Sequence, residues 1–584
     1  MNNFVAYLNT LNNANSSNEN ALAEAQITNN YYKKFHVERN LGFYLAEKLK
    51  EKPTCVILTG HAGDGKTSLV YQILKSLKMI EEGSSLKKHE QKYSIELERD
   101  LLYIKDMSEL MEEKQLELLR KAIKGKKDGV SSIVVSNTGP LINTFRQLIK
   151  IGHIKNVSED IAEMKLLEVM DKNSGVEITV GDSEILLINM ARIDNVVLVP
   201  KLIDRISSDE LWEGCTNCQK VDACPIYNNY KSIKDNKTNV NSFVTSYYRW
   251  LFELDRRLTV RQILAQLSYS MTGNLTCNDV SESSSSEMKF RYHFSNLFFG
   301  YKGLEVNEEA RQIRAIEELQ ELNLDSKETK YDYDFFVKND FTHLTDSTKE
   351  VAFEIWDKRS QKYRLKPVDF MQTDEPYQLR KAIRRMNFLF GRFNEETTNY
   401  LLDQLFSPVF SNYISYRSKK VTVKEKRNVK ATIYKALNFI LVGTHLEKDM
   451  GKIYLPLQRH GTGNQNVQLL LGELNDNDIN VDQEYLGSIY DDDESHYEIN
   501  LIFSSGKKFK IPLMLFDYFN RISLGAVTTS INPSLSHGID TMKSQLFNDY
   551  KYRDENEIIR LLIHTLNGPK LIKLQIDQLE LFVD

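Results

Sequence analysis

The chain has 584 residues and a formal net charge of −5, with 41% hydrophobic and 27% charged residues. This length is too great for one hydrophobic core, so we expect two to four domains. The slightly acidic balance excludes a globally basic nucleic-acid binder, and any such contact must come from local basic patches.

Three further properties concern the cellular location. No uncharged apolar stretch reaches about 18 residues, so we expect no membrane span. Residues 1–25 are rich in Asn, Ala and Ser and contain no apolar core, which argues against a secretory signal. Five cysteines in so long a chain do not form a disulfide framework, so the expected compartment is the cytoplasm.

In chain order, the first predicted element is an amphipathic helix at His36–Lys50, which leads into an apolar strand at Cys55–Thr59. A helix with Leu69, Ile73 and Leu77 on one face follows. The loop between strand and helix fits the phosphate-binding pattern G-x-x-x-x-G-K-[S/T]. Its predicted nucleotide contacts are Gly60, His61, Ala62, Gly63, Asp64, Gly65, Lys66, Thr67 and Ser68.

The residue types of this loop suit a polyphosphate. Gly60, Gly63 and Gly65 let backbone N–H groups turn inward at a helix N-terminus, where the dipole favours anions. Lys66 can reach the β- and γ-phosphates, and the Thr67 hydroxyl is placed to ligate Mg²⁺. The alternative is a coincidental glycine-rich turn.

A second carboxylate is predicted after the apolar strand Leu101–Ile104. Asp106 would hold Mg²⁺ through water, and Glu109 would polarise the attacking water. The alternative for Asp106 is a helix N-cap or a solvated strand end. Lys105, directly before it, departs from the usual apolar run.

The next apolar strand, Ser132–Asn137, ends in a polar residue. AAA+ and related ATPases keep a residue that senses the γ-phosphate at this place, so Asn137 is the candidate, with Thr138 as its alternative. A helix capped by Thr259 follows further on. Arg261 at its start resembles the lid arginine of AAA+ proteins, and Arg256 and Arg257 are competitors, as is a plain surface ion pair.

A cysteine group lies in the predicted lid. Cys215, Cys218 and Cys224 fall within ten residues, and a C-x₂-C pair can wrap a tetrahedral metal. Cys277 is the natural fourth ligand, with His293 and His153 as alternatives. We expect a structural zinc, with an iron–sulfur cluster or unliganded thiols as alternatives.

Two basic segments beyond residue 300 are candidates for DNA phosphate contacts. The first is a stripe on a helix near Leu379–Phe393, and the second runs from Arg417 to Lys430. Solvated charged faces are the alternative for both. The stripe consists of Arg380, Lys381, Arg384 and Arg385.

Three segments invite a family comparison. Gly63–Lys66, Ser132–Asn137 and Cys224–Asn228 resemble the F component of the Dpt restriction system, although His61, Ala62 and Thr67 differ from its usual form. This resemblance implies an ATPase that works with helicase-like and nuclease-associated subunits in bacteria that restrict DNA lacking phosphorothioate modification. It also implies that Lys66, Thr67, Asp106 and Asn137 carry nucleotide binding and hydrolysis.

The predicted fold is an α/β P-loop NTPase core with a helical lid that carries a Cys-rich metal site, then a helical region and a small α+β domain. The predicted divisions are an N-terminal helical segment (1–50), the core (51–205), the lid (206–300), a helical domain (301–450) and the C-terminal domain (451–584).

The predicted function is that of an ATP-hydrolysing subunit of an anti-phage DNA restriction complex, in an oligomer and without a nuclease motif of its own. One alternative is a STAND-type signalling ATPase that gates oligomerisation. The other is a nucleotide-dependent scaffold with little turnover.

Overall fold

A computed structural model describes residues 2–12, 29–81, 83–171, 175–282, 286–365, 374–443, 452–457, 466–486, 496–526, 531–550, 558–565, 568–577 and 580–583. These residues form two compact units, which meet in sequence between Leu401 and Leu402, inside helix α22 (Glu395–Leu405). Each unit is described by itself. No helix in the described ranges is long and apolar enough to cross a membrane.

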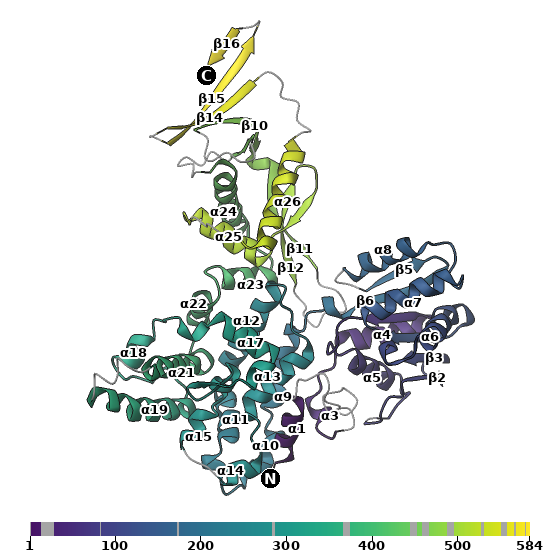
Figure 1. The fold of residues 1–584 in the computed structure, drawn as a ribbon, viewed down its shortest axis with the longest axis vertical. Helices are drawn as coiled ribbons and strands as arrows, with labels where there is room; N and C mark the ends of the chain where they lie inside the picture. The colour runs from purple at the N-terminus through teal and green to yellow at the C-terminus, as the bar shows by residue number, and fades with distance from the viewer. Residues whose placement is uncertain are drawn as a thin grey trace. The chain divides into compact units, whose positions relative to one another are not determined.

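The first unit contains a six-stranded sheet in the order β2-β3-β4-β1-β6-β5 (Figure 1). The central strands β3, β4, β1 and β6 are parallel, whereas β2 and β5 pair antiparallel at the two edges. The predicted α/β core is therefore confirmed. The strands are β1 (Cys55–Thr59), β2 (His89–Ser94), β3 (Arg99–Ile104), β4 (Ser131–Val135), β5 (Val176–Val180) and β6 (Ser183–Asn189).

Helices cover both faces of this sheet, and β1 shows why. Successive strand residues point to opposite faces. Val56 and Leu58 belong to a core shared with two helices, and Cys55 and Ile57 belong to a core shared with three others. Burial on both faces makes β1 a continuous apolar run. The first pair of helices is α4 (Asn40–Glu51) and α5 (Lys66–Ser76), and the other three are α6 (Glu112–Gly125), α7 (Thr138–Lys150) and α8 (Glu159–Met170).

The strand order determines which loops meet. Strand β4 lies between β1 and β3, and all three run in the same direction. The segments that follow them begin at Gly60, Lys105 and Ser136. Because the carboxyl ends of parallel strands lie along one edge, these three segments are neighbours, as ligand sites of open α/β sheets require.

The remainder of the first unit is helical. Helix α13 (Val260–Thr272) begins with a capping box between Thr259 and Gln262, which confirms the predicted cap, and ends at Gly273 with a φ of +58°. The other helices named below are α1 (Asn3–Leu11), α3 (Tyr32–Phe35), α9 (Val199–Ile206), α10 (Asp209–Thr216), α11 (Pro225–Asp235), α12 (Lys237–Glu253), α14 (Cys277–Glu282), α15 (Ser286–Arg291), α16 (Phe294–Phe298), α17 (Arg314–Leu322), α18 (Asp332–Phe336), α19 (Asp346–Leu365) and α21 (Glu375–Phe390).

The predicted helix at His36–Lys50 begins later than expected. Residues 36–39 are not helical, and α4 starts at Asn40. The side-chain amide of Gln72 accepts the N–H of Arg39 at 3.0 Å and donates to its carbonyl at 2.9 Å. This tertiary contact satisfies both backbone groups of Arg39, so the chain there does not need a helical turn.

The prediction that the basic stripe on α21 is a surface for DNA phosphates is wrong for three of its four residues. Lys381, Arg384 and Arg385 are 6%, 5% and 0% exposed. Arg385 Nη1 lies 2.6 Å and Lys381 Nζ 3.2 Å from the two oxygens of Asp325. Arg384 Nε donates to Asp332 at 2.9 Å. These three cations neutralise buried carboxylates and are not available to DNA phosphates.

The second unit combines an antiparallel five-stranded sheet, β16-β15-β14-β10-β9, with a three-stranded one, β11-β12-β13. Strand β13 ends at Lys510, and a helix begins at Leu513. The strands are β9 (Lys452–Pro456), β10 (Val467–Asn475), β11 (Ile479–Tyr485), β12 (Tyr497–Phe503), β13 (Lys508–Lys510), β14 (Ile558–Thr565), β15 (Gly568–Asp577) and β16 (Glu580–Val583), and the helices are α23 (Phe410–Ser418), α24 (Val423–Val442), α25 (Leu513–Ser523) and α26 (Pro533–Tyr550).

The second predicted basic segment lies at α23 and α24. Lys419, Lys420, Lys424 and Arg427 are exposed, whereas Lys426 is paired with Asp482. Of the two candidate DNA surfaces, the segment from Arg417 to Lys430 is therefore the one with several exposed cations.

Candidate functional site

The loop Gly60–Thr67, called the glycine loop below, borders a cavity of about 320 Å³ in the first unit. Three segments at the carboxyl edge of the sheet line this cavity, together with α13 and the N-terminal part of the chain. The loop residues that line it are Ala62, Gly63, Gly65, Lys66, Thr67 and, at the start of α5, Ser68.

The backbone conformation of the loop requires glycine at three positions. Gly60, Gly63 and Gly65 have φ values of +137°, +89° and +84°, which side-chain-bearing residues rarely adopt. Gly65 is the N-cap of α5, so the first N–H groups of that helix are directed at the cavity edge. An anion at this place would meet unpaired backbone donors and the positive end of the helix dipole.

Lys66 is buried, with 6% exposure. Its ammonium donates to the carbonyls of Gly60 at 3.0 Å and His61 at 2.7 Å, and to Asn137 Oδ1 at 3.2 Å. Burial lowers the pKa of Lys66, and the charge of the nearby Asp106 opposes this effect. A polyphosphate oxygen could take the place of these neutral acceptors.

Asp106 lines the same cavity as Thr67. One carboxylate oxygen also accepts the N–H of Ser108 at 2.8 Å and caps the short helix Met107–Glu109. The N-cap alternative for Asp106 is therefore confirmed, and the predicted Mg²⁺ role stays a prediction, for which the capping carboxylate keeps a second oxygen. A hydroxyl and a carboxylate are oxygen donors that Mg²⁺ accepts together with waters and substrate phosphates.

Glu109 also lines the cavity, with 40% of its side chain exposed. Its Oε2 lies 3.9 Å from Nζ of Lys105, which is 4% exposed and lines the cavity too. Sequence reasoning missed Lys105 as a site residue. Its position directly before Asp106 was the signal, because a charged residue is unusual at the end of a buried parallel strand.

Asn137 connects two of the converging segments. Its Oδ1 accepts from Lys66, and its Nδ2 donates to Ser108 Oγ at 3.2 Å. The alternative candidate, Thr138, instead has its hydroxyl 3.2 Å from the Thr59 hydroxyl. Asn137 is therefore the polar group of this strand end that contacts the loop lysine.

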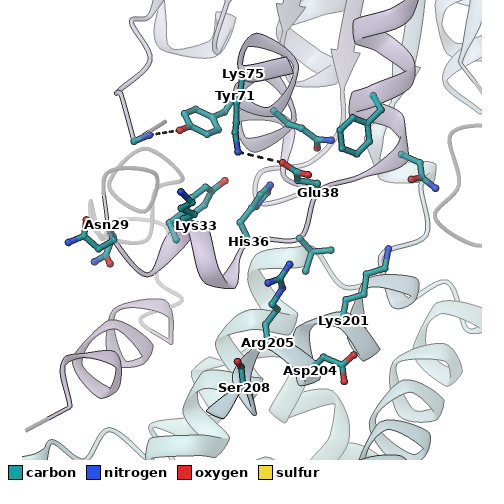
Figure 2. Close-up of a pocket in the computed structure, with 17 residues that line it drawn as sticks. Asn29, Lys33, His36, Glu38, Tyr71, Lys75, Lys201, Asp204, Arg205 and Ser208 are labelled. Carbon is teal, nitrogen blue, oxygen red and sulfur yellow. Dashed lines mark hydrogen bonds and ion pairs between the residues drawn. The ribbon is translucent and has the colours of Figure 1, made fainter. Parts of the chain in front are cut away.

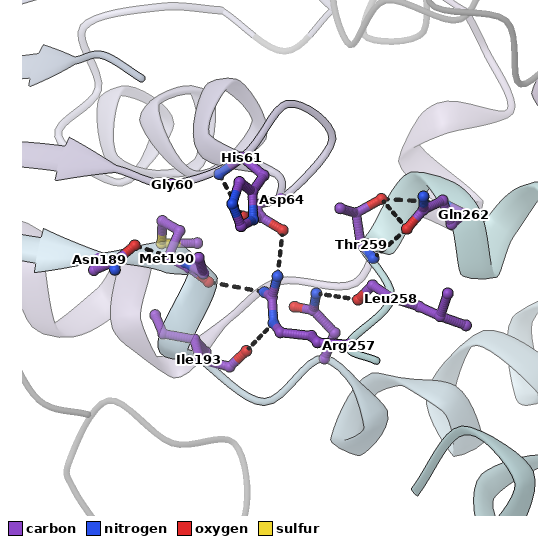
Figure 3. A network of polar contacts seen from close by, with 12 residues as sticks. Gly60, His61, Asp64, Asn189, Met190, Ile193, Arg257, Leu258, Thr259 and Gln262 are labelled. Carbon is purple, nitrogen blue, oxygen red and sulfur yellow. Dashed lines mark hydrogen bonds and ion pairs between the residues drawn. The ribbon is translucent and has the colours of Figure 1, made fainter. Parts of the chain in front are cut away.

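The three candidate arginines have three different surroundings. Arg261 lines the cavity, and its charge lowers the pKa of Lys66, so the two cations are neighbours. Arg257 is paired with Asp64 of the glycine loop at 2.7 Å (Figure 3). Arg256 is bound to Glu318 at 2.8 Å on α17. Arg261 is thus the one of the three that lies at the cavity.

Part of the cavity lining is apolar, and the sequence does not predict this apolar wall. Its side chains come from α1, α3, the 3-10 helix Val196–Leu198, α9 and α13, which are far apart in the chain, so no local pattern predicts it. Such a wall suits a planar heterocycle beside the phosphate-facing side. The apolar lining residues include Tyr7, Leu11, Phe35, Leu198, Leu202 and Leu264.

A second, more open cavity of about 1020 Å³ adjoins the first (Figure 2). Tyr32 and His36 line both cavities, with their rings stacked at 4.8 Å. Burial lowers the pKa of His36 to about 4, so its imidazole is neutral at pH 7. The charged side chains that line this second cavity include both cations and carboxylates, and Lys75 lies 3.8 Å from Glu38.

Two of the four predicted zinc ligands, Cys215 and Cys277, contact the N-cap residue of the N-terminal helix. Asn2, the N-cap of α1, donates to Cys215 Sγ at 3.4 Å, and its carbonyl is 3.9 Å from Cys277 Sγ. Burial raises the pKa of Cys215 and that of Cys224, the latter to about 11, so both are thiols at pH 7. Over the described ranges no three or more His, Cys, Asp or Glu side chains are grouped to hold a metal ion.

The two histidines that are alternatives for the fourth zinc ligand contact other side chains. The His293 Nδ1 lies 2.9 Å from the Ser295 hydroxyl, and His153 Nε2 lies 3.2 Å from Arg120. The predicted metal site stays a prediction.

Comparison with known proteins gave no match: no family model, no curated protein and no solved structure is similar to this chain.

Proposed function

We propose that this chain binds ATP with Mg²⁺ in the 320 Å³ cavity and hydrolyses it. The observation that carries the proposal is the convergence of Lys66, Asp106 and Asn137 from three different strand ends onto one cavity. Apolar side chains that could hold a base line the same cavity. A coincidental glycine-rich turn would not explain this arrangement.

The proposed binding step uses the glycine loop. Lys66 and the N–H groups at the start of α5 bind the β- and γ-phosphates, and the apolar wall holds the base. Thr67 and Asp106 hold Mg²⁺, which neutralises phosphate charge. Because Lys66 already donates to three neutral oxygens, it exchanges these bonds for stronger, charge-assisted ones.

The proposed chemical step uses the other three groups. Glu109 accepts a proton from water as the water oxygen bonds to the γ-phosphorus, and the bond to the β-bridging oxygen breaks to release ADP and phosphate. Asn137 and Arg261 stabilise the charge on the γ-phosphoryl oxygens. Lys105 Nζ lies 3.9 Å from the Glu109 carboxylate.

Steady-state phosphate release tests this proposal. We expect Mg²⁺-dependent release by the wild-type protein, loss of release in Glu109→Gln with ATP still bound, and loss of both in Lys66→Ala. If the wild type binds ATP but releases phosphate no faster than Lys66→Ala, the scaffold alternative holds instead.

We further propose that this ATPase serves a DNA restriction complex against phage, with helicase-like and nuclease-associated subunits as partners in an oligomer. The support is the resemblance of Gly63–Lys66, Ser132–Asn137 and Cys224–Asn228 to the F component of the Dpt system. Partner identification after native co-purification tests it. Stimulation of hydrolysis by duplex DNA favours this role, and trigger-dependent assembly without DNA favours a STAND-type ATPase.

A structural zinc on Cys215, Cys218, Cys224 and Cys277 is also proposed. The support is that Cys215 and Cys277 contact the same residue: Asn2 Nδ2 lies 3.4 Å from Cys215 Sγ, and the Asn2 carbonyl lies 3.9 Å from Cys277 Sγ. Zinc would have to displace the thiol protons, which makes its binding pH-dependent. Metal analysis should find about one zinc per chain. Iron with a brown colour would indicate a cluster, and no metal would leave unliganded thiols.

A further inference from the structure

Arg257 joins the glycine loop to the segment that leads into α13 (Figure 3). Its Nη1 donates to Asp64 Oδ1 at 2.7 Å and its Nη2 to the Met190 carbonyl at 2.8 Å. Its Nε donates to the Ile193 carbonyl at 3.2 Å. One guanidinium therefore connects the loop after β1 with the turn after β6.

Asp64 is the loop residue that receives this contact. Its side chain is fully buried, and its second oxygen accepts the backbone N–H of His61 at 2.9 Å. The carboxylate thus fixes the turn of the loop on one side and is neutralised by Arg257 on the other. Losing the cation of a buried ion pair strongly destabilises the conformation that buries the carboxylate. The Arg257–Asp64 pair therefore constrains the glycine loop.

The start of α13 also contacts the loop directly. The backbone N–H of Arg261 donates to the Gly63 carbonyl at 3.2 Å. A Cβ at Gly63 would lie 3.1 Å from Arg261 Cβ and 3.1 Å from Thr259 Oγ1. Any displacement of α13 must therefore break contacts with the glycine loop or carry the loop with it.

The same short segment carries a group that reaches the cavity. Arg261 follows Arg257 closely and lines the cavity beside Lys66. The two arginines differ in what they contact: Arg261 lines the cavity, and Arg257 donates to Asp64 of the glycine loop.

We propose that Arg257 is a positioning residue of this site: through Asp64 it keeps the glycine loop in its phosphate-receiving conformation and couples that loop to the position of α13. This inference rests on the proposed nucleotide function. Because Arg257 does not contact the reacting atoms, its loss changes nucleotide affinity and KM and leaves kcat at saturating ATP nearly unchanged.

The test compares six proteins: wild type, Arg257→Gln, Arg257→Lys, Asp64→Asn, the double variant Arg257→Gln/Asp64→Asn and the control Arg256→Gln. The control removes the neighbouring arginine, which is bound to Glu318 and Glu321 away from the loop. Four quantities are measured: the ATP Kd by calorimetry, KM, kcat, and amide hydrogen exchange of residues 60–65 without nucleotide.

We expect Arg257→Gln and Asp64→Asn each to raise Kd and KM roughly tenfold or more and to accelerate exchange in the loop. Arg257→Lys recovers part of the affinity because it keeps a cation, and Arg256→Gln behaves as wild type. The double variant is no worse than the worse single variant, because both changes break one contact.

The inference is overturned if Arg257→Gln keeps wild-type Kd and loop exchange, or if kcat falls with Kd unchanged. Loss of ATP binding in the wild type would instead defeat the proposed function, while loop exchange without nucleotide would still report on the Arg257 contact. Should Arg257→Gln not fold, Arg257→Lys and Asp64→Asn decide by the same readouts.

Discussion

The side-chain oxygen of Asn137 lies 3.2 Å from the ammonium nitrogen of Lys66, although 71 residues separate them in the chain. The parallel pairing of β1 with β4 produces this contact, because it places the ends of both strands at one edge. An amide that contacts both Lys66 and Ser108 can respond to what occupies the cavity.

Replacing Asn137 with Ala should reduce kcat roughly 10- to 100-fold and change the ATP Kd little, because the amide acts on the γ-phosphoryl charge. Single-turnover hydrolysis measures the effect. Thr138→Val is the matched control, since Thr138 contacts Thr59 instead, and it should retain near wild-type kcat. Equal losses of kcat in both variants would mean that the Asn137 side chain has no role of its own in hydrolysis.

Replacing Leu264 with Ala should weaken ATP binding several-fold, because Leu264 lines the apolar wall and the change removes apolar contact with the base. Tripolyphosphate has no base, so its affinity should not change. Calorimetry with the two ligands separates the effects. A parallel loss of tripolyphosphate affinity would contradict the assignment of this wall to the base.

Replacing Arg385 with Ala should lower the free energy of unfolding by about 3–5 kcal/mol, because it leaves the buried Asp325 without one of its two cations. Chemical denaturation measures this loss. Arg380→Ala, on the same helix but half-buried, should stay within about 1 kcal/mol of wild type. If Arg385→Ala unfolds like wild type and binds DNA more weakly, the stripe is a DNA surface after all.

Acid should destabilise the first unit through His293, which is fully buried. Burial lowers the pKa of His293 to about 3. Since this pKa lies below the unfolded value of about 6.5, the favourable contribution is complete above pH 6.5 and is lost as the pH falls toward 3. From pH 7 to pH 5 the loss is roughly 2 kcal/mol.

The unfolding free energy of wild type and of His293→Gln at both pH values checks this. The pH-dependent difference should shrink in the variant, whatever its absolute stability. An unchanged difference would mean that His293 is not the responsible group.

The sequence predicted those parts of the site that depend on local pattern. The glycine loop, Asp106, Asn137 and Arg261 each follow a recognisable strand or begin a recognisable helix, and the structure brings all of them to one cavity. The glycine loop, Asp106 and Asn137 meet because parallel strands end at one edge of the sheet, and Arg261 reaches the cavity from α13.

The rest depended on contacts between distant residues. Arg257 could not be separated from its neighbours, because its partner Asp64 lies 193 positions away. The sequence does not reveal that the stripe on α21 is buried, because Asp325 and Asp332 are more than 50 residues from their cations. Periodicity reports which face is apolar, but not which charges are neutralised by a remote carboxylate.

The most direct test of the proposed function is calorimetric titration of the full chain with Mg²⁺–ATP, beside Lys66→Ala. We predict saturable binding to one site by the wild-type protein and loss of that binding in the variant, since Lys66 is the buried cation of the cavity. Absence of heat with wild type at millimolar ATP and GTP, or equal binding by both proteins, would contradict a nucleotide site at the glycine loop.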